Sequence, residues 1–84
     1  MDIGQRLLNA AHRSASTGTI VLEEHRGVPI VFRPPLAMIG RDFVYFDIDG
    51  KSYVTDLKTL PFTVDTIIEI LEEVGKEHTT MGEI

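Results

Sequence analysis

The chain begins with a hydrophobic pattern at helical spacing. Asp2 is a residue type that caps helices, and the apolar positions that follow it recur every three to four residues. These positions are Ile3, Leu7, Leu8 and Ala11. The small polar residues 14–18 then interrupt the pattern, so we expect the first helix to end there.

A second helical pattern lies near the other end of the chain. Thr63 is placed to cap a helix over residues 64–74, Phe62 to pack on Ile67 ahead of the cap, and Gly75 to end the helix. Its apolar stripe consists of Val64, Ile67, Ile68, Leu71 and Val74. Residues 76–84 show no periodicity, and we expect them to form a flexible C-terminal tail.

Between the helices, two apolar runs that predict strands flank a short turn: residues 19–24 and 28–33. A three-residue loop at 25–27 would set Leu22 opposite Ile30, whereas a two-residue turn at Arg26-Gly27 would set Glu23 opposite Ile30. The first register pairs two apolar side chains across the strands, so we expect the three-residue loop.

Pro29 favours one position in the sheet for the second of these strands. Proline has no backbone N–H, and in the three-residue-loop register its nitrogen points away from the first strand. A neighbour on that side would lose a hydrogen bond. We therefore expect residues 28–33 to form an edge strand and residues 19–24 to lie inside the sheet, next to the second hairpin. A homodimer would then form by side-chain packing and not by strand pairing across this edge.

The segment FVYFDIDGKSYVTDL, residues 43–57, resembles a cation loop, a phosphate loop or a hairpin. A phosphate loop requires a glycine where Tyr45 stands and a helix after the motif, and an EF-hand needs more oxygen ligands and a distal glutamate. A type I′ turn at Asp49-Gly50 instead produces well-matched strand pairs. These pairs are Ile48–Lys51, Phe46–Tyr53 and Tyr45–Val54. We expect a hairpin with no metal.

The predicted order is α-β-β-β-β-α, a small α+β domain over residues 1–75 in which two hairpins form an antiparallel sheet packed against the terminal helices. The second hairpin carries apolar residues on both faces, and two short helices cannot cover both. Either the sheet curls strongly toward a half-barrel and buries one face on itself, or the second face contacts another protein.

The amino-acid composition excludes some classes of site and disfavours others. The 84 residues carry a net charge of −5 and no cysteine, so disulfides and cysteine-ligated zinc sites are excluded. No apolar run approaches the ~20 residues of a membrane helix, and the N-terminus lacks a secretory pattern, so we expect a cytoplasmic protein without membrane contact. The three histidines are not at metal-ligand spacing, and no nucleophile motif occurs. We predict no catalytic, cofactor-binding or metal-binding residues.

Charge is unevenly divided along the chain. Residues 1–41 contain all five arginines and sum to +2, whereas residues 42–84 sum to −7. One consequence to consider is nucleic-acid binding by this arginine-rich half, with phosphate contacts from arginines and base stacking on aromatic residues. The residues concerned are Arg26, Arg33 and Arg41, with Tyr45 or Phe43 for stacking.

The connection RPPLAMIGR, residues 33–41, combines a stiff proline pair, apolar side chains and flanking arginines, as interface segments do. The candidate partner-binding residues are Arg33, Pro34, Pro35, Leu36, Met38, Arg41, Phe43 and Tyr45. The alternative is a loop that covers the core. The sequence thus favours a non-enzymatic protein-interaction or assembly module that forms a homodimer. A small nucleic-acid-binding domain and a small enzyme with an unrecognised site are the alternatives.

Overall fold

A computed structural model describes residues 2–34 and 42–82, with side chains up to residue 77. Its elements follow the predicted order α-β-β-β-β-α. They are α1 (Ile3–Thr17), β1 (Val21–His25), β2 (Val28–Arg33), β3 (Phe43–Ile48), β4 (Lys51–Asp56) and α2 (Leu60–Gly82). The strands form one antiparallel sheet in the order β1-β2-β3-β4, and the sheet is not closed. Within the described residues, no helix has the length and apolar character needed to cross a membrane.

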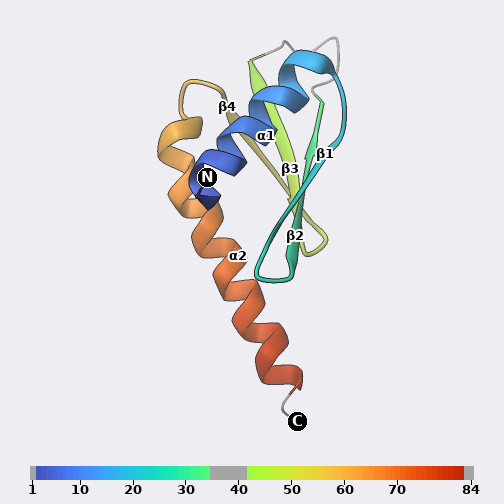
Figure 1. Ribbon diagram of the computed structural model, residues 1–84, viewed down its shortest axis with the longest axis vertical. Helices are drawn as coiled ribbons and strands as arrows, with labels where there is room; N and C mark the ends of the chain where they lie inside the picture. The colour runs from blue at the N-terminus through green and yellow to red at the C-terminus, as the bar shows by residue number, and fades with distance from the viewer. Residues whose placement is uncertain (1, 35–41, 83–84) are drawn as a thin grey trace.

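Both helices lie against the same face of the sheet (Figure 1). β2 and β3 bury every second residue beneath the helices, and these side chains form the core with the apolar residues of α1 and α2. Phe32, Phe46 and Tyr53 cross the middle of the sheet in a row, with ring centroids 6.0 Å and 5.2 Å apart. The second half of α2 extends past the strands (Figure 1).

Helix α1 begins at the predicted cap and ends within the predicted segment, residues 14–18. The Asp2 side chain accepts a hydrogen bond from the Gln5 backbone N–H at 2.8 Å. The helix continues to Thr17, where Gly18, with φ +69°, donates its N–H to the Ser14 carbonyl at 3.0 Å. Ser14, the first residue of this small polar segment, is buried, so the helix continues through it and packs there against the core. The helix ends at the residue that accepts a left-handed conformation.

Helix α2 begins earlier and ends later than its apolar pattern predicts. The Thr59 carbonyl accepts from the Phe62 and Thr63 N–H groups, both at 2.9 Å, so Thr63 lies in the first turn and is not the cap. Pro61 is tolerated there because first-turn N–H groups need no helical partner. Phe62 is 81% exposed and does not pack on Ile67, so the predicted staple is wrong. The helix continues beyond Gly75 to Gly82. The flexibility of residues 76–84 stays a prediction.

The second hairpin has the predicted register, and the first does not. Asp49 and Gly50 have φ of +52° and +80°, and the pairs Ile48–Lys51, Phe46–Tyr53 and Tyr45–Val54 are all present. Arg26 and Gly27 have φ of +54° and +85° and form the same kind of two-residue turn. The expected three-residue loop is therefore wrong, and Glu23 pairs with Ile30.

Contacts with the helices explain the register of the first hairpin. It turns Glu23 and His25 toward the helices, where polar groups meet them. Arg6 of α1 contacts Glu23 at 2.9 Å, and Glu72 of α2 lies 3.7 Å from the imidazole of His25. The pairing of Leu22 with Ile30 is preferred only when the two strands are considered without the helices. Because polar groups of the helices contact Glu23 and His25, turning these two side chains toward the helices costs little free energy, and the two-residue turn is no longer disfavoured.

The strand order also corrects a prediction. β2 pairs with β1 on one side and with β3 on the other, so it is an inner strand, and β1 is an edge. Pairing between β2 and β3 starts at Ile30, opposite Ile48. Pro29 lies one residue outside this ladder, next to the Asp49-Gly50 turn. Its missing N–H therefore costs no hydrogen bond between strands.

Candidate functional site

The side of the sheet opposite the helices is not covered by any described element, and we call it the open face. It consists of the strand residues that alternate with the core residues. They are Leu22, Glu24, Pro29, Val31, Arg33, Phe43, Tyr45, Asp47, Ser52, Val54 and Asp56. Leu22 is 65% exposed and Val54 57%, and Ile20, directly before β1, is 69% exposed.

An ion pair lies at the centre of the open face. The Arg33 Nε of β2 lies 2.8 Å from an Asp47 carboxylate oxygen of β3, and the Ser52 hydroxyl donates to the other oxygen at 2.7 Å. Asp47 stands directly opposite Val31 on β2 and Ser52 on β4. Both charges are thus matched within the chain, and apolar side chains surround them.

Three of the predicted partner-binding residues come together on the open face. Arg33 stands directly opposite Tyr45. Phe43, two residues before Tyr45 and 39% exposed, lies on the same face of β3. Pro34 is half-buried just after β2. The other four predicted residues lie outside the described part of the chain. They are Pro35, Leu36, Met38 and Arg41.

Sequence reasoning missed the most exposed apolar side chains of this face. The predicted register pairs Leu22 with Ile30 as in a core, and Val54, although expected with Phe43 and Tyr45 on one apolar face of the second hairpin, is not among the predicted partner-binding residues. The strict alternation of β2, with Val28, Ile30 and Phe32 buried, indicates which face is inside. Combined with a two-residue turn, this alternation places Leu22 outside.

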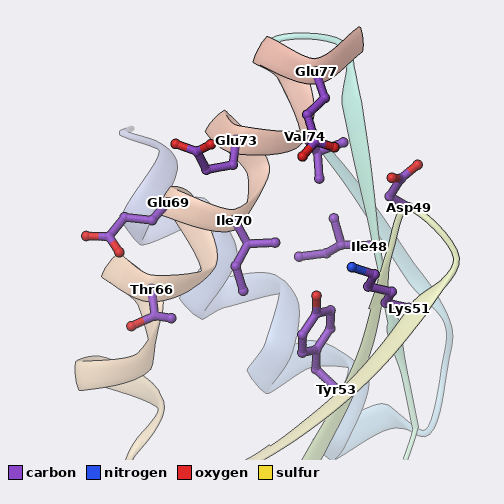
Figure 2. Close-up of a pocket in the computed structure, with 10 residues that line it drawn as sticks. All are labelled: Ile48, Asp49, Lys51, Tyr53, Thr66, Glu69, Ile70, Glu73, Val74 and Glu77. Carbon is purple, nitrogen blue, oxygen red and sulfur yellow. The ribbon is translucent and has the colours of Figure 1, made fainter.

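A pocket of about 310 Å³ opens between α2 and the β3–β4 hairpin (Figure 2). Apolar side chains from both elements point into it, and carboxylates line its helix side. The residues are Ile48, Asp49, Lys51, Tyr53, Thr66, Glu69, Ile70, Glu73, Val74 and Glu77. Glu69, Glu73 and Glu77 are spaced four residues apart and form one row along the helix, so the pocket has an acidic wall.

Asp56 has a structural role at the start of α2. Asp56 precedes α2, and its carboxylate accepts hydrogen bonds from the Thr59 hydroxyl and from the Thr59 backbone N–H at 2.7 Å. These bonds, the hydroxyl first, lower the pKa of Asp56 below its usual value. Among the side chains that the structure describes, no group of three or more His, Asp or Glu residues is arranged to hold a metal ion.

No protein family, curated protein or solved structure matches this chain.

Proposed function

We propose that this protein is a non-enzymatic interaction module that self-associates as a homodimer through the open face. The observation that carries the proposal is the one-sided burial of the sheet. Leu22, Val54 and Phe43 remain exposed on one face, while the helices cover the other. An apolar sheet face left in water is a common mark of a protein-interaction site.

Electrostatics favours a second copy of this chain as the occupant. Each copy carries a net charge of −5, so two copies approach best through surfaces of low net charge. At the centre of the open face, Arg33 and Asp47 neutralise each other, so Glu24 and Asp56 account for the net charge of this face. The described side chains of α2, by contrast, carry a strong excess of acid. They are Asp65, Glu69, Glu72, Glu73 and Glu77, against Lys76.

The ion pair also reduces the cost of burying the face. A charge buried without a partner would oppose association strongly, but Arg33 and Asp47 already contact each other, and Ser52 donates to Asp47. The same contact disfavours nucleic-acid binding, because Arg33, which stands opposite Tyr45 on the open face, is engaged by a carboxylate. A phosphate group would have to compete with Asp47 for Arg33.

The test is solution mass, measured by light scattering over a concentration series, for the wild type and for the double variant Leu22→Thr/Val54→Thr. Both substitutions place a β-branched residue, which suits a strand, at the position and reduce the apolar surface. Burying a whole Leu or Val side chain contributes roughly 1.5–3 kcal/mol. Both positions are buried twice in a symmetric dimer, so we expect the dimer Kd to rise at least about 100-fold.

Phe62→Thr is the matched control, because Phe62 is an even more exposed apolar residue that lies on α2, away from the open face. It should leave the dimer Kd unchanged. A wild-type protein that stays monomeric at millimolar concentration would overturn the homodimer. A dimer weakened by Phe62→Thr and not by the double variant would place the interface on the helix side.

A further inference from the structure

Strand β4 has a free backbone edge. Among the described strands it is the last of the sheet, and it pairs there on one side only, with β3. In a two-residue hairpin the residues next to the turn, here Ile48 and Lys51, form a hydrogen-bonded pair, and bonded and non-bonded pairs then alternate. The N–H and C=O groups of Ser52 and Val54 therefore point away from β3. They can accept a further strand.

The acidic pocket lies directly beside this edge. Tyr53, the residue between Ser52 and Val54, points from β4 toward α2 and faces Ile70 across the pocket, as Figure 2 shows. At one end, the hydroxyls of Thr55 on β4 and Thr63 on α2 approach to 3.3 Å and connect strand and helix. Past this contact the pocket opens. Every second side chain of a strand added to β4 would point into the pocket.

We propose that this groove, between the free edge of β4 and α2, binds an extended peptide with basic side chains at alternate positions. The peptide backbone pairs with Ser52 and Val54. The apolar stems of its lysine or arginine side chains lie along Tyr53 and Ile70, and their charged ends reach the carboxylates of α2. The peptide uses the backbone groups of Ser52 and Val54, whereas the side chains of these residues belong to the open face, so peptide binding does not require dimerisation.

Charge selects the class of peptide. Glu69, Glu73 and Glu77 stand one helical turn apart along the groove, and Lys51 is the one cation among the residues that line it. The contact of Glu73 with Lys76, at 3.7 Å, is largely exposed to solvent and competes only weakly with a ligand. A second copy of the chain is a poor occupant, because pairing β4 with β4 would bring two such acidic rows together.

The first experiment measures amide hydrogen exchange by NMR. The probe is the acetylated and amidated hexapeptide Thr-Lys-Val-Lys-Val-Thr. On binding, the amides of Ser52 and Val54 should exchange at least about tenfold more slowly, because they then donate to peptide carbonyls. Leu22 and Glu24 are the internal control, since their amides point outward on the other free edge, β1. Their exchange should not change.

Two control peptides separate strand pairing from charge attraction. The same sequence with its four central nitrogens methylated cannot donate to the Ser52 and Val54 carbonyls, and its methyl groups hold the peptide away from β4. The sequence with glutamate in place of lysine reverses the charge. Neither should bind. No binding of the basic probe at millimolar concentration would overturn the proposal. Equal binding of the methylated peptide, or equal protection of β1, would overturn it as well.

The second experiment titrates protein variants by fluorescence anisotropy with a labelled probe. Glu69→Gln/Glu73→Gln removes two carboxylates from the groove and should weaken binding about fivefold or more, with a smaller dependence of the Kd on salt. Glu24→Gln removes an equally exposed carboxylate from the open face and should leave the Kd unchanged. An equal loss in both variants would show attraction to net negative charge and would refute a defined site.

Discussion

Replacing Arg26 by asparagine should stabilise the protein. Arg26 is the first residue of the turn between β1 and β2 and has a φ of +54°, in the left-handed region. Asparagine adopts this region more readily than arginine, and Asn-Gly is the preferred sequence of a type I′ turn. The Arg26 side chain is exposed, so the substitution does not disturb the core.

The size of the effect follows from this single dihedral angle. The left-handed conformation costs an ordinary L-residue roughly 1–2 kcal/mol. If asparagine recovers half of this, the free energy of unfolding rises by roughly 0.5–1 kcal/mol. In a domain of this size 1 kcal/mol shifts Tm by about 4–8 °C, so Arg26→Asn should raise Tm by about 2–8 °C.

Thermal unfolding followed by circular dichroism, at one fixed protein concentration, measures this change. Arg26→Gln is the control, because it removes the same charge without favouring positive φ. In a three-residue loop Arg26 would have a negative φ, and asparagine would bring no such gain. Equal Tm values for Arg26→Asn and Arg26→Gln would therefore refute the two-residue turn and the register built on it.

Three further predictions concern the other hairpin, the start of α2 and the core. Gly50→Val should lower the free energy of unfolding by about 1–3 kcal/mol in urea titrations, because Gly50 has a φ of +80°, and calcium should leave Tm unchanged. A rise in Tm with calcium would contradict the turn-only interpretation. Asp56→Asn should destabilise the protein at neutral pH. The lowered pKa of Asp56 means that its contribution is present above the usual Asp pKa and is lost as pH falls through the lowered value. The Tm difference from wild type should therefore shrink in acid, and a constant difference would exclude the charge as its cause. Phe32→Ala should cost about 3–5 kcal/mol in the same titrations, because Phe32 is fully buried, and a loss below about 1 kcal/mol would contradict its place in the core.

Local signals predicted the element types, the order of the chain and one hairpin. Asp49-Gly50 specifies its turn without help from the rest of the molecule, because both residues tolerate the required positive φ and the flanking side chains match. Asp2 likewise caps α1 through a bond to a residue three positions away. In both cases the groups that interact are neighbours in sequence.

The candidate site was predicted in part for the same reason. Arg33, Phe43 and Tyr45 were expected to contact a partner, and they do share the open face. Leu22 was not expected on this face, and Val54 was expected on it but not among the partner-binding residues, because their exposure depends on which face the helices cover. The pocket beside α2 was not foreseen, since its two walls are far apart along the chain.

The amino-acid sequence by itself determined an α+β chain with two terminal helices, two hairpins and apolar residues on both faces of the second hairpin. Only the tertiary structure decided the register of β1 against β2 and the inner position of β2. The physical reason for the register is that Glu23 contacts Arg6, and His25 contacts Glu72, on the helix side of the sheet. Both contact residues are distant from β1 in sequence. Likewise, the missing N–H of Pro29 costs no hydrogen bond between strands only because the β2–β3 ladder starts one residue after it. Neither fact can be derived from the pairing of two strands alone.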